Sequence, residues 1–349
     1  MTWIPLLLAE KSPNLRYLVL KNLLHRNDSD EEVQELCQLR LEDPIIKDLV
    51  NSQNKDGSWK SSDVLGLKLQ GELRNTAHAL IRLGYLGFDK NFLPVQKAAE
   101  FLYSHQLNSG AWPIKDGTSS FKHPNHGQVI SPMITTIPLR ALAMCGYAND
   151  PRSEKSYDYL LELRAEDGSW PTYLSPDGKV GYQVVGYRQL PNSRLGCRSN
   201  STGALTAFSY HPKRRSHPDI KKVLDLLLAR ETRDRQSLGF EVARYIGMEA
   251  AHGYLTYYTR WDIAHILNLC WRIGVNPSDP RVADLLTYLK KIQGSYGLWE
   301  YQPKPEASRW ITYDILFSLS KLDEKTTDEW INTQPRTKYK AYPRARRRY

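Results

Sequence analysis

The chain has 349 residues and a formal net charge of +10. Hydrophobic residues make up 41% and charged residues 25%, the balance of a folded globular protein, which excludes an intrinsically disordered chain. No stretch approaches the roughly 18 consecutive apolar residues that a membrane-spanning helix requires. The four cysteines are far apart, without the CxxC spacing of a metal or redox site. These features predict a cytoplasmic protein, with peripheral attachment to a membrane as an alternative.

The basic charge is concentrated at the C-terminus. Residues 336–349 contain seven Lys and Arg and no acid, which leaves a charge of +3 for the rest of the chain. A terminal block of like charge is typical of a solvated arm. We therefore expect one folded domain over residues 1–335 and a disordered tail over 336–349. The anionic partner of such a tail would be a membrane surface or a nucleic acid.

The first predicted elements in chain order are two N-terminal helices, Asn14 to Leu24 and Asp30 to Leu39. The acidic string Asp28-Ser29-Asp30-Glu31 lies between them. Small polar and acidic residues at this position are typical of an N-cap. We therefore expect this string to cap the second helix.

From residue 49 onward the sequence repeats the pattern Leu-x3-(Gln/Arg)-x3-Gly-x-Trp. Clear copies lie near residues 49–59, 101–112, 159–170 and 289–299, and a degenerate copy lies near 227–240. The residues before the turn have apolar positions at three- and four-residue spacing, as in Val95 to His105 and Arg281 to Ile292, which indicates an amphipathic helix. The glycine then supplies a turn.

A second, more apolar helix is predicted after each turn, and a Ser, Thr or Asn at or near its start is interpreted as an N-cap. These helices are Asn75 to Gly84, Thr135 to Cys145, Ser201 to Tyr210, Thr259 to Arg272 and Ser308 to Leu319. One such hairpin cannot bury its apolar side alone. Together with the N-terminal pair, we expect about twelve helices that close into a ring, with the apolar helices inside.

The repeated Gln-x3-Gly-x-Trp resembles the QW motif of squalene–hopene and oxidosqualene cyclases, and the resemblance covers about residues 45 to 322. It implies an all-α fold, the (α/α)6 toroid, which also occurs in protein prenyltransferase β subunits. The opening SPNLRYLVLKNLL and the closing EASRWITYDILFSLSKL resemble a small stand-alone squalene-cyclase-like subgroup. The resemblance implies a scaffold role for the Gln or Arg and the Trp of each clear copy: Gln53, Trp59, Gln106, Trp112, Arg164, Trp170, Gln293 and Trp299.

The catalytic signatures of these families are absent from the sequence. There is no Asp-x-Asp-Asp motif, with which class II terpenoid cyclases protonate their substrates, and no Asp-Asp-x-x-Asp or Asp-x-Cys metal site. His123 and His126 are close in sequence but lack further metal ligands nearby. We therefore expect no metal and no cofactor.

The candidate catalytic residues are Asp262, His265 and Asp314. Asp262 and His265 are three residues apart and would share one face of a helix. A carboxyl group hydrogen-bonded to a histidine in an aromatic cavity could have a shifted pKa and donate a proton. The alternative is that Asp262 interacts with the helix dipole and His265 bonds to it. Asp314 is expected to pair with an arginine, such as Arg309 or Arg260, because a lone buried carboxylate is costly.

The expected substrate-binding residues are His78 and a set of aromatic side chains. His78 lies on a predicted inner helix, where a hydrogen-bonded core histidine is the alternative. Arg140 and Arg198 could bind a diphosphate or carboxylate head group or form buried ion pairs. The aromatic rings could stabilise a carbocation through their faces; they are Tyr258, Trp261, Trp310 and Tyr313.

Two classes of function remain. The first is a class II terpenoid cyclase-like enzyme, an isomerase or lyase, which binds an isoprenoid or another apolar ligand in the ring centre and starts a cyclisation or isomerisation with an acid. The second is a non-catalytic toroid that binds a lipid or a protein, with the basic tail as a docking arm. A large apolar cavity faced by Asp262 would favour the first, and a ring centre plugged by Trp, Tyr and Leu side chains would favour the second. The sequence leaves the substrate and the oligomeric state open.

Overall fold

The computed structural model describes residues 3–60, 71–113, 122–123, 127–128, 131–172, 189–190, 192–229, 238–249 and 262–322. Fourteen α-helices and two short 3-10 turns, Arg214–Ser216 and Pro305–Ala307, lie in these ranges. One antiparallel hairpin joins β1 (Lys122–His123) to β2 (Gly127–Gln128). Apart from this hairpin the described chain is helical, so the predicted all-α class is confirmed. The predicted tail, 336–349, lies outside the described residues.

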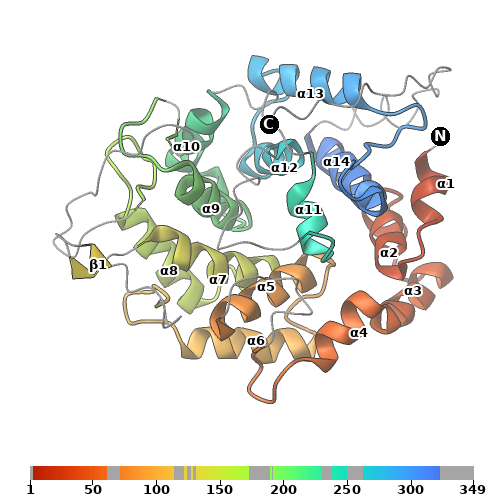
Figure 1. Cartoon of the computed structure of the whole chain (residues 1–349), viewed down its shortest axis with the longest axis horizontal. Helices are drawn as coiled ribbons and strands as arrows, with labels where there is room; N and C mark the ends of the chain where they lie inside the picture. The colour runs from red at the N-terminus through yellow and green to blue at the C-terminus, as the bar shows by residue number, and fades with distance from the viewer. Residues whose placement is uncertain are drawn as a thin grey trace, which may run out of the picture.

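The helices are arranged in two concentric layers around a common centre (Figure 1). The inner helices are α2 (Pro13–Asn22), α5 (Glu72–Tyr85), α7 (Pro132–Met144), α9 (Arg198–Ser209), α12 (Ile263–Ile273) and α14 (Ser308–Leu322). The outer helices are α3 (Glu31–Glu42), α4 (Pro44–Asn51), α6 (Leu93–Ser104), α8 (Pro151–Glu162), α10 (Pro218–Leu228) and α13 (Pro280–Ile292). Neighbouring inner helices pack side by side from α5 through α14, and α14 packs against α2. This is the predicted toroid.

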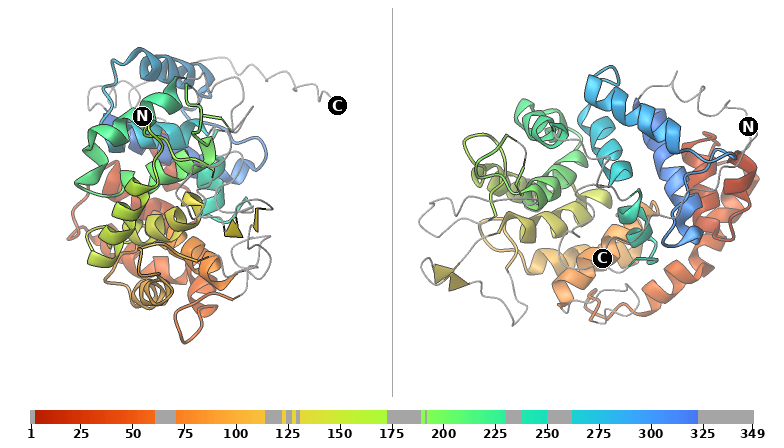
Figure 2. Two further views of the ribbon diagram at one scale, coloured as in Figure 1. Left: turned by 90° about the vertical axis from the view of Figure 1, so that its left-hand side faces the viewer. Right: turned by 45° about the horizontal axis from the view of Figure 1, so that its top comes forward.

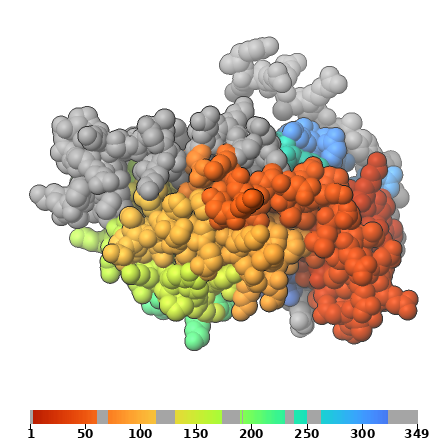
Figure 3. All heavy atoms as spheres, turned by 90° about the horizontal axis from the view of Figure 1, so that it is seen from below, coloured from red at the N-terminus to blue at the C-terminus, as the bar shows by residue number. Residues whose placement is uncertain are grey.

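Two further helices complete the ring. The short helix α1 (Trp3–Leu8) packs against α2 and α14, whereas α11 (Phe240–Tyr245) lies inside the ring and packs against α14 and α5. Figure 2 shows α11 among the inner helices in a second orientation. On the side of α4 and α6, the outer helices form a continuous surface (Figure 3).

Each clear copy of the Gly-x-Trp pattern forms the same turn. The glycine has a left-handed backbone, as at Gly110 with φ of +91°, and a Cβ atom there would lie 2.5 Å from the Lys155 carbonyl oxygen. Two residues later the Trp indole N–H donates to the carbonyl oxygen of the leucine ten positions earlier. The four indole bonds measure 2.7 to 2.9 Å and join Trp59 to Leu49, Trp112 to Leu102, Trp170 to Leu160 and Trp299 to Leu289.

A hydroxyl residue in the first turns of four inner helices holds the Trp turn that precedes it. Each accepts a hydrogen bond from the backbone N–H of the Trp in the preceding turn, at 2.9 to 3.3 Å; the four acceptors are Thr76, Thr135, Ser201 and Thr312. Three inner helices begin a turn earlier than predicted, at Glu72 in α5, Pro132 in α7 and Arg198 in α9. Helix α14 begins at the predicted Ser308. At Thr135 and Ser201 the N-cap interpretation was wrong, because the hydroxyl holds the Trp turn against the inner helix.

The Gln or Arg of the pattern links one outer helix to the next. Gln53 Nε2 donates to the Gly57 carbonyl oxygen in its own turn and to the Pro94 carbonyl oxygen in α6. In the third copy, Arg164 replaces the glutamine and pairs with Asp219 at the start of α10, at 2.9 Å. These contacts agree with the bracing role that the resemblance implies.

The degenerate fifth copy follows another path. Gly239 has the same left-handed backbone, with φ of +84°, but Glu241 stands where the clear copies have Trp. The chain continues directly into α11, whose six residues are all buried. This copy therefore contributes a helix to the ring centre in place of a Trp turn.

The N-terminal pair closes the ring against α5. Arg40 in α3 donates from Nε to Asn14 Oδ1 at 2.9 Å and from Nη2 to the Leu86 carbonyl oxygen, just after α5. As predicted, Asp30 caps α3, because its carboxylate accepts from the Glu32 amide at 3.1 Å. No helix in the described ranges combines the length and the apolar character that a membrane span requires.

Candidate functional site

Helix α11 brings a buried carboxylate into the centre of the ring. Glu241 Oε1 pairs with Arg140 Nη1 of α7 at 2.9 Å and also with Arg244 one turn away. Arg244 Nη1 lies 3.3 Å from Nδ1 of His78 on α5. Burial raises the pKa of Glu241, but the charges of Arg244 and Arg140 outweigh burial and hold this pKa below its usual value. The buried charge network and α11 therefore occupy space inside the ring.

His78, a predicted substrate-binding residue, belongs to this network. Burial and the charge of Arg244 hold its pKa well below the usual value, so its imidazole is neutral. Its contact is with Arg244, and it does not line the cavity described below. Its role in substrate binding stays a prediction.

Asp262 joins the starts of two helices. Its carboxylate accepts from the backbone amides of Gly239 and Glu241, each at 2.7 Å, and from the amide of Ala264 at 3.1 Å. The first two bonds hold α11 and the third caps α12. Burial raises the pKa of Asp262 to about 7, because its effect is larger than that of the backbone hydrogen bonds, which lower this pKa. Both carboxylate oxygens are thus engaged as acceptors.

The predicted pair of Asp262 and His265 side chains does not form. Asp262 reaches His265 only at its backbone amide, at 3.5 Å. The His265 imidazole instead contacts Thr206 Oγ1 through Nε2 at 3.0 Å, and burial lowers its pKa to about 3. Asp262 lies at the start of α12, as the alternative interpretation with the helix dipole expected, but the His265 side chain does not bond to it. The catalytic role of both residues stays a prediction.

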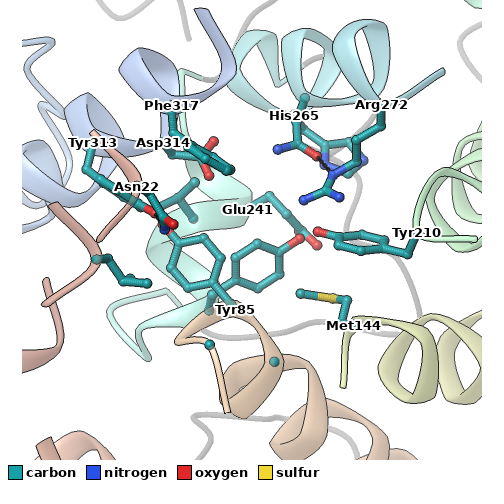
Figure 4. A pocket seen from close by; sticks show the side chains of 16 residues that line it. Asn22, Tyr85, Met144, Tyr210, Glu241, His265, Arg272, Tyr313, Asp314 and Phe317 are labelled. Carbon is teal, nitrogen blue, oxygen red and sulfur yellow. Dashed lines mark hydrogen bonds between the residues drawn. The ribbon is translucent and has the colours of Figure 1, made fainter. Parts of the chain in front are cut away.

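A cavity of about 180 Å³ lies between α11 and the inner helices α2, α5, α12 and α14 (Figure 4). Its deep wall consists of buried residues: Leu18, Glu241, Val242, Tyr245, His265, Tyr313 and Asp314. Its mouth consists of partly exposed residues: Asn22, Gly84, Tyr85, Met144, Tyr210, Asn268, Arg272 and Phe317, with the exposed Gly87 beside them. The mouth therefore lies at the C-terminal ends of α2, α5, α7 and α9.

Asp314 is the acid that faces this cavity. Its side chain comes from the middle of α14 and is 7% exposed. Among the described residues it makes no hydrogen bond or ion pair. Burial and, to a lesser extent, the negative charge of Asp262 raise the pKa of Asp314 to about 7. The predicted partner Arg309 pairs instead with Glu10 at 3.0 Å, and Arg260 lies outside the described residues.

Aromatic rings surround Asp314. Tyr313 lines the cavity, accepts a 2.6 Å hydrogen bond from Asn22 Nδ2, and stacks on Phe317 with 6.0 Å between ring centroids. Tyr85 packs against Tyr245 at 4.8 Å. Trp310, whose ring was predicted to bind the ligand, is buried and does not line the cavity; its ring centroid lies 6.4 Å from that of Tyr85. Tyr258 and Trp261 lie outside the described residues.

Several cavity residues were missed in the sequence. Arg272 and Asn268 on α12 lie at i+7 and i+3 from His265, so the helical period places them on one face with it. That spacing was a usable signal. Two cavity residues gave no such signal. Tyr210 lies at the C-terminal end of α9, and Glu241 lies in the degenerate copy of the repeat. No cluster of three or more His, Cys, Asp or Glu side chains suited to a metal ion occurs in the described part of the chain.

No protein-family model matches the sequence, and no curated protein matches it. Among solved structures, the chain is similar to the type II terpene cyclase MstE from Scytonema. The apo form is 12% identical with a TM-score of 0.31 over 79% of this chain and 95% of that one. A variant bound to geranylgeranyl dihydroxybenzoate is 13% identical, with a TM-score of 0.31 over 80% and 95%. Similarity at this level assigns no function to the chain.

Proposed function

We propose that the central cavity binds a short apolar, isoprenoid-like ligand and that Asp314 protonates one of its double bonds. The reaction would be an acid-initiated isomerisation or cyclisation. The observation that carries the proposal is a buried carboxyl group without a hydrogen-bond partner among the described residues, facing a cavity lined with aromatic rings.

The acid has the properties that proton donation requires. A general acid works best when its pKa is near the operating pH, and burial raises the pKa of Asp314 to about 7. A carboxyl group that bonds to no neighbouring side chain is free to approach a ligand. Asp262 has a similar pKa, but its two oxygens already accept backbone hydrogen bonds, so Asp314 is the better candidate.

The cavity limits the size of the ligand. A cavity of about 150 Å³ is known to hold a benzene molecule, so a volume of about 180 Å³ suits roughly seven to ten non-hydrogen atoms. This matches a five-carbon isoprenoid unit with a small head group. A long polyisoprenoid would need the space that α11 occupies.

The proposed step balances without a further reactant. The Asp314 carboxyl proton forms a new C–H bond with the π electrons of the alkene, which leaves a carboxylate on Asp314 and a tertiary cation on the neighbouring carbon. The faces of nearby rings, such as Tyr85 and Tyr313, stabilise this cation. Loss of a proton from an adjacent carbon to the Asp314 carboxylate yields an isomerised alkene and restores the acid.

The experiment is to incubate the full chain in D2O with 3-methylbut-2-en-1-ol, 3-methylbut-2-enoate, dimethylallyl phosphate and their ten-carbon homologues, and to analyse extracts by mass spectrometry. We expect deuterium incorporation into carbon positions with the wild type. Asp314→Asn should reduce it by about 100-fold or more, the usual contribution of a general acid. Asp48→Asn, an exposed acid on α4, is the matched control and should retain activity.

The second candidate function is a non-catalytic toroid that binds a lipid or a protein. The observation that favours it is that α11 and the buried Arg140–Glu241–Arg244 network take up space inside the ring, which limits the room for a larger ligand. Absence of deuterium incorporation with every substrate, by a folded wild-type protein, would overturn the enzymatic proposal in favour of this one.

A further inference from the structure

Arg272 is held rigidly at the mouth of the cavity. Its guanidinium lies over the ring of Tyr210, 3.9 Å from the ring centroid, and over the ring of Trp271, 4.3 Å from the centroid. Its Nε donates to Asn268 Oδ1 at 2.8 Å. Three contacts therefore fix the plane of the guanidinium before any ligand binds.

The remaining donors of this guanidinium are unused. Within the described residues, the terminal Nη atoms of Arg272 make no hydrogen bond and no ion pair. Figure 4 shows the group directed into the cavity, beside His265 and across from Asp314. The other carboxylate in the cavity wall, Glu241, is already paired with Arg140 and Arg244. Arg272 thus presents unused N–H donors and a positive charge, offset only in part by Asp314 across the cavity, to the space where a ligand would lie.

We infer that Arg272 is the binding site for an oxyanion head group, and that the ligand of this cavity is an amphiphile with a carboxylate or phosphate at one end. A planar guanidinium offers two parallel N–H donors, which match the two oxygens of such a group. The hydrocarbon end then lies against Leu18, Val242 and the ring of Tyr313, near Asp314. This inference rests on the ligand-binding part of the proposed function and adds the chemical class of the ligand.

The test compares ligands that share a five-carbon unit and differ in the head group. Isothermal titration calorimetry on the full chain would measure the Kd of 3-methylbut-2-enoate, dimethylallyl phosphate and the neutral 3-methylbut-2-en-1-ol. We expect at least one of the anions to bind about tenfold tighter than the alcohol or better. Which anion binds more tightly distinguishes a carboxylate site from a phosphate site.

Variants identify the residue that recognises the head group. Arg272→Gln should abolish the preference for the anion. Arg152→Gln is the matched control. Arg152 also lies over a tyrosine ring, 3.7 Å from the centroid of Tyr103, but it is on the outer surface, so this variant should keep the preference for the anion. Arg272→Lys keeps the charge without the planar fork and serves if Arg272→Gln fails to fold; it should weaken carboxylate binding more than phosphate binding.

The results separate this inference from the proposed function. Equal binding of alcohol and anions, absence of binding by both anions, or an unchanged preference in Arg272→Gln would overturn the inference. Alcohol turnover that needs Asp314 but not Arg272 would preserve the proposed function and reject the oxyanion site. Anion binding that needs Arg272, without deuterium incorporation, would preserve the oxyanion site and reject the catalytic step.

Discussion

The Asp262 side chain and the Glu241 backbone are joined by a hydrogen bond of 2.7 Å, which ties the start of α11 to the residue that begins α12. The same carboxylate accepts from the Gly239 amide. The position of α11 in the ring centre therefore depends on an acid that is distant from it in sequence.

Replacement of Asp262 should destabilise the fold. Asp262→Ala leaves the buried amides of Gly239, Glu241 and Ala264 without an acceptor, and each unsatisfied buried donor costs about 1–3 kcal/mol. We expect a loss of about 3 kcal/mol or more in the free energy of unfolding, measured with urea. The control is Asp30→Ala, which removes a more exposed cap and should cost about 1 kcal/mol. Equal losses in the two variants would contradict a linking role for Asp262.

Removal of the Glu241 charge should also destabilise the fold. Glu241→Gln leaves Arg140 and Arg244 as buried cations without a counterion, and breaking a buried ion pair costs about 3–5 kcal/mol. Thermal and urea unfolding would measure the loss. Glu42→Gln, at the exposed ion pair with Lys47, is the control and should cost about 1 kcal/mol or less. A similar loss in both variants would show that the central network is not stabilising.

The raised pKa of Asp314 predicts a dependence of stability on pH. Asp has a reference pKa of 3.8, and in the folded chain that of Asp314 is about 7. Between these values the folded state keeps a proton that the unfolded state releases, so stability falls as pH rises, by about 1.4 kcal/mol per pH unit, and is level above about pH 7. Asp314→Asn removes this cost, so its stability relative to the wild type should increase from about pH 4 to about pH 7 and then stay constant.

The difference between variant and wild type is the quantity to measure in that experiment. The lowered pKa of His265 acts in the opposite direction, because the unfolded imidazole binds a proton below its reference pKa of 6.5, and this contribution cancels in the difference. Urea unfolding at a series of pH values would test the prediction. A constant difference across the series would contradict the raised pKa of Asp314.

The glycine of the repeated turn should not tolerate a side chain. Gly110→Ala would place a Cβ atom 2.5 Å from the Lys155 carbonyl oxygen and also strain a left-handed backbone with φ of +91°. Gly274 has a similar φ of +85° but no atom within 4 Å of the added Cβ, so Gly274→Ala tests the backbone strain alone. We expect Gly274→Ala to lower the free energy of unfolding by about 1–2 kcal/mol. Gly110→Ala should lower it by considerably more, and equal losses would show that the outer helices can separate.

The ring could be predicted from the sequence because its turns repeat. The spacing of glycine and tryptophan marks the end of each outer helix, and hydrophobic periodicity marks the helices themselves. The role of Thr76 could not be predicted, because a threonine near a helix start is usually a cap, and only the three-dimensional structure brings the Trp59 amide to its hydroxyl. The same limit explains why the pairing of Asp262 with His265 was wrong.

The candidate site was predicted in part. Asp314, Tyr313 and His265 do line one cavity, since they lie on the inward faces of α12 and α14. The contribution of Glu241 could not be foreseen. Helix α11 has only six residues and replaces a loop in the degenerate copy, so no periodic signal distinguishes it from a turn. The roles of all these residues in binding and catalysis remain predictions.

The scaffold of this molecule and the filling of its centre are encoded in separate parts of the chain. The Trp turns and their leucine, threonine and serine partners maintain the circumference, whereas the six residues of α11 determine how much room is left inside. The size of the chamber can therefore change through replacement of one short segment while the ring stays intact. A homologous ring with an ordinary loop after the fifth outer helix would accommodate a larger molecule with the same architecture.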